Sequence, residues 1–323
     1  VEEGTDLIPA GETPFARDSA FCFRSSDLRQ WVEEKTGGRV KAVEVASISI
    51  EDLRLGGPER VTEQLLMLEP ESICVVNALS YRDIEVFVAG LLVAEAQGKR
   101  YLYRTAASFV RVRAGIAPRA LLTPTELGFD QQGGGLFVVG SYVPKTTHQL
   151  EALLEQTDIT CIEIDVEALL TDVQQEREID RVTKTAEAAL AAGADVVIFT
   201  SRRLVTVADA ERSLVIGQRV SDSLIAVVRT IQIRPRFVLA KGGITSSDVA
   251  TMGLDIKRAS VLGQIQPGVP VWQCGPESRY PGMTYIVFPG NVGDVSSLVE
   301  VVTMARLQDP PKPFVGDNHV KSK

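Results

Sequence analysis

"FVLAKGGITSSD", residues 237–248, is a short apolar run followed by two glycines and a cluster of serine and threonine. An apolar run bounded by turn residues is typical of a buried strand, and a Ser/Thr/Asp cluster is typical of a helix start. Strand, glycine-rich turn and helix in this order form the repeating unit of α/β proteins. The stretch therefore predicts a mainly parallel sheet whose strands end in glycine-rich loops.

Two further segments have the same layout. "YIVFPGNVGD" spans residues 285–294, and "LFVVGS", residues 136–141, places Gly140 and Ser141 directly after an apolar run. Ligands of open α/β sheets collect at the carboxyl ends of strands, and a glycine lets the backbone approach a phosphate closely because it has no Cβ. Three such turns in one domain could line a crevice that binds a nucleotide.

The same residues also fit a purely structural interpretation. Strand-to-helix turns commonly use glycine, and Thr245 with Asp248 matches the capping pattern that begins a helix. The P-loop pattern GxxxxGK[ST] and the dinucleotide pattern GxGxxG are both absent from the sequence. Spacing alone therefore leaves phosphate binding and simple turn formation both open.

Apolar periodicity extends the alternation of strands and helices along the whole chain. In the first part we expect helices at 25–38, 56–70, 81–99 and 105–115, and strands at 39–50, 72–78 and 100–104. In the second part we expect strands at 136–141, 160–166, 195–201, 236–240 and 283–288, and helices at 146–156, 180–193, 208–231 and 294–307. This order predicts parallel sheets covered by helices.

The stretch "FDQQGGG" interrupts this rhythm and is the best linker candidate. We place a domain boundary near Gly133, which gives a substrate domain at 1–133, a nucleotide domain at 134–308 and a polar tail at 309–323. The predicted fold class is α/β, with two domains, each a mainly parallel sheet flanked by helices, and an interdomain cleft.

Composition excludes several classes of function. The formal net charge is −8 without a basic block, which disfavours nucleic acid as a partner. The four cysteines form no CxxC pair, so we expect reduced thiols in a cytoplasmic protein rather than a disulfide framework or a zinc site. No apolar stretch is long enough to predict a membrane span, and the two histidines offer little for a metal cluster or a Ser-His-Asp relay.

Six segments together resemble one protein family. "GSYVPKTTHQL", "KGGITSSDVA", "GQIQPGVPVW" and "FPGNVGD" resemble the C-terminal nucleotide-binding domain of the four-carbon acid sugar kinase family. Upstream, "ETPFARDSAFCFRSSDLRQWVEEKTGG" and "YLYRTAASFVRVRAGI" resemble the later part of the N-terminal, substrate-binding domain of that family. The resemblance covers nearly the whole chain, and it is the combination of motifs that is specific.

The resemblance implies an ATP-dependent kinase that phosphorylates a hydroxyl of threonate, erythronate or an oxo-tetronate, with ATP and Mg²⁺ as cofactors and a homodimer as a possible assembly. It implies that ATP contacts Ser141, Gly242, Gly243, Ile244, Thr245 and Gly290. It also implies that Asn291 and Gly293 lie near the ATP. The family opens with an Asp-Asp-x-Thr-Gly motif, which is absent here, so the catalytic residue is unknown. We expect the substrate domain to lack its N-terminal part.

Four further side chains are candidates for binding. Arg104 could clamp a substrate carboxylate, and Ser108 and Asn77 could recognise its hydroxyls, whereas Lys241 could reach a phosphate. Each also has a structural interpretation: an ion pair for Arg104, a cap or turn for Ser108 and Asn77, and a solvated strand end for Lys241.

Two other classes of function stay open. The segments "CIEIDV", "DVVIFTS" and "FVLAKGGITS" could be strands of a TIM barrel, a lyase or isomerase with a phosphate-binding GGI loop. The chain could also be a catalytically inactive module that binds ATP or a sugar acid, which the absent acidic motif would favour.

Overall fold

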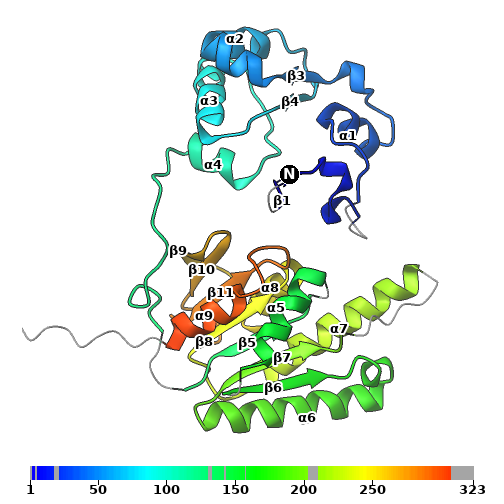
Figure 1. Cartoon of the computed structure of the whole chain (residues 1–323), viewed down its shortest axis with the longest axis vertical. Helices are drawn as coiled ribbons and strands as arrows, with labels where there is room; N and C mark the ends of the chain where they lie inside the picture. Colours follow the sequence, from blue (N-terminus) through cyan, green and yellow to red (C-terminus); the bar gives the residue numbers. More distant parts are fainter. Residues whose placement is uncertain are drawn as a thin grey trace, which may run out of the picture. The chain divides into compact units, whose positions relative to one another are not determined.

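The computed structural model describes residues 2–3, 6–17, 22–129, 133–141, 143–156, 158–202 and 210–306. The chain forms two compact units that divide between Pro118 and Arg119 (Figure 1). Gln131 and Gln132 of the predicted linker, and the predicted tail from residue 309 on, lie outside the described residues.

The first unit is built on a short parallel pair of strands. Its strands are β1 (Glu2–Glu3), β2 (Asp6–Leu7), β3 (Ala46–Ile48) and β4 (Cys74–Val76), and β3 pairs with β4 in parallel. Its α-helices are α1 (Leu28–Lys35), α2 (Gly57–Leu66), α3 (Tyr81–Ala96) and α4 (Ala107–Arg113), with short turns η1 (Ala10–Glu12), η2 (Pro14–Arg17), η3 (Ala42–Glu44) and η4 (Asp52–Gly56). Its core lies between β3, α2 and α3.

Local sequence explains where the main helices of this unit begin and end. Asp27 caps α1 by accepting a hydrogen bond from the backbone of Arg29, and Gly37 and Gly38 end the helix with positive φ. Ser80 and Asp83 form a capping box that starts α3. The predicted helix starts and stops are confirmed at these points.

The second unit contains a seven-stranded sheet in the order β6-β7-β5-β8-β11-β10-β9. Its strands are β5 (Leu136–Val139), β6 (Ile159–Ile164), β7 (Asp195–Thr200), β8 (Phe237–Lys241), β9 (Ala259–Gln266), β10 (Val269–Cys274) and β11 (Thr284–Phe288). The five strands from β6 to β11 pair in parallel, whereas β10 and β9 are antiparallel. The α/β class is confirmed.

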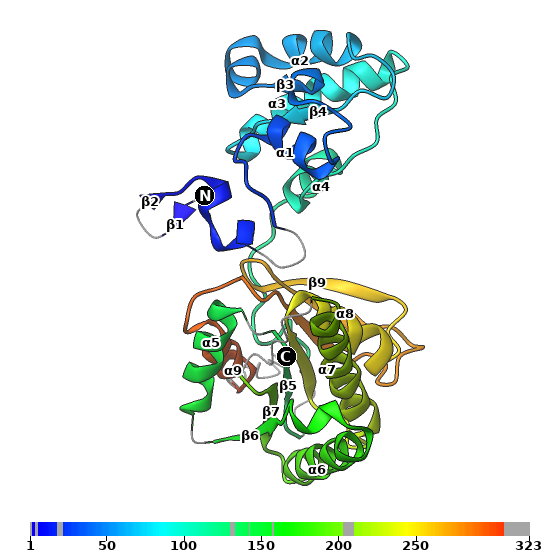
Figure 2. The ribbon, with the colours of Figure 1, turned by 90° about the vertical axis from the view of Figure 1, so that its right-hand side faces the viewer.

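Helices cover both faces of this sheet (Figure 2). The helices are α5 (Pro144–Leu154), α6 (Asp172–Ala191), α7 (Ala210–Thr230), α8 (Gly243–Asp248) and α9 (Ser297–Arg306), with turns η5 (Ala168–Leu170) and η6 (Val249–Gly253). Alternation along β5 separates the two cores, because Leu136 and Val138 pack toward α6 and α7, whereas Phe137 and Val139 pack toward α5 and α9.

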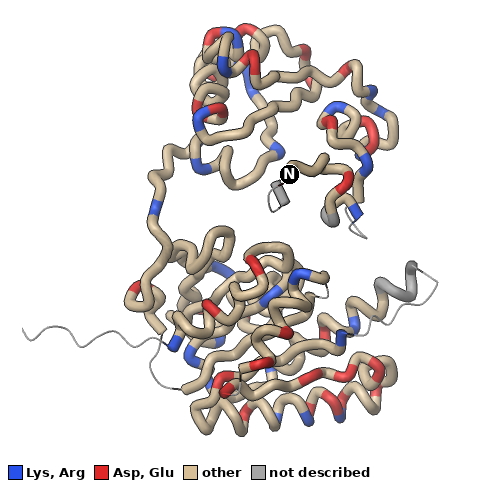
Figure 3. Tube along the Cα trace, in the orientation of Figure 1, with Lys and Arg blue, Asp and Glu red and all other residues tan. Residues whose placement is uncertain are grey.

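Figure 3 shows acidic and basic residues interspersed along α6. Lys184 pairs there with Asp180, and Arg181 pairs with Glu178. Among the described helices, none combines the length and the apolar character that a membrane span needs.

The structure differs from the predicted elements in several places. Helix α6 begins at Asp172, before the predicted start at 180. Residues 100–104 form no strand, and the strand predicted at 39–50 is reduced to β3, because η3 occupies its first half. The hairpin of β9 and β10 was not predicted. Gly263 and Pro270 lie within it, and both residue types weaken a strand pattern.

The division between the units precedes the boundary predicted near Gly133. The segment after Arg119 packs on the second unit: Leu122 and Leu127 belong to its core, and the backbone N–H of Leu122 donates to the Gln264 carbonyl at 2.8 Å. These apolar contacts, which composition does not reveal, place residues 119–129 with the sheet.

The barrel alternative does not fit the second unit. In the part that the structure describes, its sheet is open, with β6 and β9 at opposite edges. A TIM barrel has eight parallel strands that close on one another.

Candidate functional site

The three glycine-rich loops predicted from the sequence lie at one edge of the second sheet. They follow β5, β8 and β11, which are neighbours and run parallel, so their carboxyl ends meet. After β5 and β11 the chain continues into helices on one face, and after β8 it continues into α8 on the other face. Such a switch in direction opens a crevice at the carboxyl ends of the strands.

Ser141 is the point at which the three loops converge. A Cβ on Gly290 would lie 2.8 Å from the Ser141 hydroxyl oxygen, and a Cβ on Gly242 would lie 3.0 Å from the Ser141 Cβ. The hydroxyl of Thr146, on α5, donates to the Gly290 carbonyl at 2.8 Å and lies 3.3 Å from the Ser141 hydroxyl. The close approach of Ser141 therefore favours glycine at both positions, and at Gly242 the φ of +120 adds to this preference.

The loop after β8 has two glycines with different surroundings. Gly242 is buried, has φ +120, and its N–H donates to the Phe288 carbonyl at 2.8 Å. Gly243 is exposed, and a Cβ there would meet no atom within 4 Å. Ile244 follows as a 73% exposed apolar side chain. The loop thus presents backbone and an apolar side chain to open space.

Helix α8 does not begin with the capping pair proposed from the sequence. It starts at Gly243, and no side chain caps it. The Thr245 hydroxyl packs instead against Gly140, where a Cβ would lie 2.4 Å from its oxygen, and Asp248 accepts from Ser221 on α7 at 2.8 Å. Thr245 and Asp248 therefore join neighbouring segments and do not start the helix.

The loop after β11 is braced from α5. Gln149, buried on α5, donates to the Val292 carbonyl at 3.0 Å and to the Asp294 carbonyl at 2.6 Å. Gly293 has φ +83 and lies so close to Ser297 that a Cβ would come within 2.5 Å of its hydroxyl oxygen. Asn291 is exposed, and no hydrogen bond to another described residue involves its side chain. Asn291 is therefore free to contact a ligand, whereas Gly293 packs inside the fold.

Lys241 lies inside the fold. Its side chain is fully buried, its ammonium donates to the Pro289 carbonyl at 2.9 Å, and the ammonium nitrogen lies 3.9 Å from the centre of the Phe288 ring. Burial, together with the positive charge of Lys145, lowers the pKa of Lys241 to about 7. Through its hydrogen bond to the Pro289 carbonyl, Lys241 stabilises the start of the loop after β11.

We expect the buried lysine to make stability depend on pH. The pKa of Lys241 is lower in the folded than in the unfolded chain, so between about pH 7 and about pH 10 the unfolded chain binds more protons. The free energy of unfolding should therefore rise with pH across this window. Lys241→Met should remove most of that rise in urea unfolding, whereas Lys257→Met, at an exposed position, should keep it. An unchanged pH profile in Lys241→Met would contradict this assignment.

The three candidate substrate residues lie in the first unit, each in a different setting. The Asn77 side-chain amide donates to the Ser47 hydroxyl at 3.2 Å and to the Ile48 carbonyl at 3.1 Å, which ties β4 to β3. Ser108 lies in the first turn of α4. No hydrogen bond or ion pair among the described residues joins these side chains to one another or to Arg104.

Arg104 is exposed and stacks on an aromatic ring of α1. Its guanidinium carbon lies 4.9 Å from the centre of the Trp31 ring. In the described residues no carboxylate lies within ion-pair distance of Arg104. It does not end a strand, as predicted, but lies in the loop before α4, whose cap is Ala106 and not Thr105.

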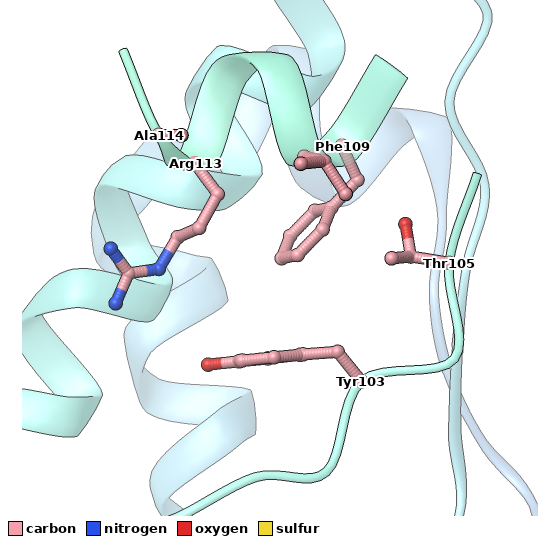
Figure 4. A pocket seen from close by; sticks show the side chains of 6 residues that line it. Tyr103, Thr105, Phe109, Arg113 and Ala114 are labelled. Carbon is pink, nitrogen blue, oxygen red and sulfur yellow. The ribbon is translucent and has the colours of Figure 1, made fainter. Parts of the chain in front are cut away.

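A shallow pocket opens beside this loop (Figure 4). It has a volume of about 340 Å³ and is lined by Tyr103, Thr105, Phe109, Val110, Arg113 and Ala114. The rings of Tyr103 and Phe109 face each other with centres 5.2 Å apart, and Arg113 pairs with Glu95 at 2.7 Å. Burial raises the pKa of Tyr103 to about 12, and its hydroxyl donates to Glu95. The pocket is apolar, which does not suit a sugar acid.

Two residues were missed from the sequence. Trp31 fits the apolar spacing of α1, so nothing in the pattern marks it as a partner of Arg104. Arg202 follows β7, and its guanidinium donates to the Ser141 carbonyl at 2.7 Å. The available signal was its place directly after a buried strand, the position that also selected Ser141.

Comparison with known proteins agrees with this architecture. Residues 136–298 match the family model described as a nucleotide-binding C-terminal domain, and residues 4–113 match that of a sugar-binding N-terminal domain. No curated protein sequence matches the chain.

Two solved proteins are similar to this chain, to different degrees. One, from Salmonella typhimurium LT2 and provisionally described as a tRNA synthase, is 16% identical over 90% of this chain, with a TM-score of 0.60. The other is a domain of unknown function from Bordetella bronchiseptica, a domain-swapped dimer with bound citrate, 18% identical over 91% of this chain in one crystal form, with a TM-score of 0.43. The chain spans 66% and 65% of their respective lengths.

Fold and site thus define a two-domain α/β protein with a nucleotide-binding and a sugar-binding domain. The chain belongs to the four-carbon acid sugar kinase family. Both domains fit small-molecule partners.

Proposed function

We propose that this chain is an ATP-dependent kinase that transfers a phosphoryl group to a hydroxyl of a four-carbon sugar acid, such as threonate, erythronate or an oxo-tetronate. The observation that carries the proposal is the convergence of three glycine-rich loops on Ser141, within the residues that match a nucleotide-binding domain. The match of residues 4–113 to a sugar-binding domain supports a polyhydroxy acceptor.

The loops fit the chemistry of a nucleotide. Beside Gly243 there is room for a phosphate to approach the backbone, and Asn291 offers an exposed amide without a described partner. The exposed Ile244 side chain provides an apolar surface of the kind on which a base can pack. When bound, ATP supplies the phosphoryl group, and these residues would hold and orient it.

The structure also limits how Mg²⁺ could be held. Among the described residues, no three His, Cys, Asp or Glu side chains lie close enough together to hold a metal ion. Mg²⁺ commonly keeps several waters and binds through substrate phosphates with one or two carboxylates. We therefore propose that Mg²⁺ enters with the nucleotide.

Arg104 is the residue that we propose for the acid group of the acceptor. It is exposed, it has no carboxylate partner among the described residues, and the Trp31 ring supports one face of the guanidinium. A guanidinium can bind a carboxylate through two parallel hydrogen bonds, which fixes its orientation. No residue of this chain is assigned as the acceptor of the hydroxyl proton.

The test is ADP formation from ATP in the presence of each four-carbon sugar acid, with gluconate and no acid as blanks. We expect turnover with one of them. Arg104→Met should then raise the KM for that acid by about tenfold or more, because it removes a charge-assisted pair. Arg111→Met is the matched control, since Arg111 also stacks on a ring of the first unit, 4.1 Å from the centre of Tyr81.

Two results would overturn the proposal. Failure to bind ATP would remove its basis. Binding of ATP without turnover of any of these acids would instead support the inactive binding module.

A further inference from the structure

Arg202 joins the carboxyl ends of two strands at the edge where the glycine loops converge. Its Nε donates to the Thr200 carbonyl at 3.1 Å, one Nη donates to the Ser141 carbonyl at 2.7 Å, and the other Nη lies 3.2 Å from the Thr200 hydroxyl. These contacts fix the half-buried guanidinium between β7 and the turn that carries Ser141.

The charge of this guanidinium is not neutralised by the groups that bind it. All of its hydrogen-bond partners are carbonyl or hydroxyl oxygens, and no carboxylate of the described residues lies within ion-pair distance. Burial lowers the pKa of Arg202, with Glu163 and Glu151 opposing this from farther away. By contrast, Arg236 and Arg306 lie near the amino ends of the parallel strands, and both pair directly with the carboxylate of Asp195.

One lysine adds positive charge at the same edge. Lys145 is exposed near the start of α5, and it is close enough to Lys241 to lower the pKa of that group. Lys145 forms no ion pair with a described residue. Two unpaired cations, Arg202 and Lys145, in a chain of net charge −8 mark this edge as a place for an anion.

We propose that Arg202 supplies positive charge that binds a phosphate chain at this edge, and that it holds Ser141 in place for the same ligand. The inference rests on the proposed function, in which the phosphates are those of ATP. A guanidinium suits this purpose because it stays charged when half-buried and, of its five N–H groups, keeps one for a phosphate oxygen beside the four that bind carbonyl and hydroxyl oxygens. Arg202 is thus assigned to ligand binding together with the three loops.

The experiment measures binding of ATP and of inorganic tripolyphosphate by calorimetry at several salt concentrations. Arg202→Gln should weaken both ligands by about tenfold or more and flatten the salt dependence of the ATP affinity. Arg202→Lys should recover part of the loss, since it restores the charge. Arg177→Gln, which removes an exposed arginine on α6, is the matched control and should leave both affinities unchanged.

The remaining outcomes separate this inference from the proposed function. Wild-type protein that binds tripolyphosphate through Arg202 but does not bind ATP would support the inference and end the proposed function. If the wild type binds ATP and Arg202→Gln binds it with unchanged affinity, the inference alone is overturned. The inference alone is also overturned if Arg202→Gln loses affinity, Arg202→Lys does not recover it, and the salt dependence of the ATP affinity stays as in the wild type. Binding of neither ligand would overturn both. Circular dichroism and melting of each variant show that it folds.

Discussion

Replacing Gly242 with alanine is expected to lower both the stability and the ATP affinity of the chain, whereas the same change at Gly243 should lower the affinity alone. Gly242 has φ +120, which side chains rarely adopt, and its Cβ would lie 3.0 Å from that of Ser141. Such strain costs about 1–3 kcal/mol. Because about 1.4 kcal/mol corresponds to tenfold in affinity, a loop that shifts to relieve the strain should bind ATP about tenfold more weakly or worse.

Substitution of Gly243 separates an effect on ligand binding from an effect on stability. Among the described residues, no atom beyond its own helix and chain neighbours lies within 4 Å of its Cβ position, so alanine there should leave the chain unstrained. Under the proposed function a phosphate occupies that space, so the added methyl should obstruct it. Calorimetric ATP binding and thermal melting of both variants test this pair. Normal ATP affinity in Gly243→Ala would contradict a phosphate beside Gly243.

The control for both variants is Gly217→Ala. Gly217 lies within α7, its Cβ position is also open, and alanine favours a helix over glycine. This variant should bind ATP as the wild type does and melt no lower. A loss of affinity in it would show that the assay does not discriminate among glycine positions.

Asp195→Ala is expected to cost the second unit about 3–5 kcal/mol of unfolding free energy, which lowers its melting temperature by about 6–20 °C. Asp195 is 5% exposed, and its carboxylate accepts from Arg236 at 3.2 Å, from Arg306 at 2.8 Å and from the Gly135 N–H at 2.6 Å. Alanine leaves these donors without their acceptor. The carboxylate links the starts of β5 and β7 to the segment before β8 and to the end of α9.

The measurement follows tryptophan fluorescence in a Trp31→Phe background, in which Trp272 is the remaining tryptophan. Trp272 packs on Tyr285, with ring centres 5.9 Å apart, so it reports on the second unit. Asp180→Asn is the control, because Asp180 pairs with Lys184 on the exposed side of α6 and should cost less than about 0.5 kcal/mol. Equal melting of the two variants would show that the buried carboxylate is not a structural anchor.

Much of the second unit could be predicted from short-range patterns. The continuous apolar runs "LFVV" and "FVLA" are typical of strands buried on both faces, and the turns after them contain the glycines of the loops. Hydrophobic periodicity is a property of neighbouring residues, so it survives without knowledge of the fold. The hairpin of β9 and β10 escaped this reasoning because Gly263 and Pro270 within its strands weaken the apolar pattern.

The sequence by itself thus determined the α/β class, the places of the glycine loops and, through the combination of motifs, the family. Only the tertiary structure decided that β8 lies between β5 and β11, that Ser141 fits between Gly242 and Gly290, and that Lys241 is buried. It also placed Arg202 against Ser141, 61 residues away along the chain. The physical reason is that strand order and burial are set by packing between distant segments, which no local pattern encodes.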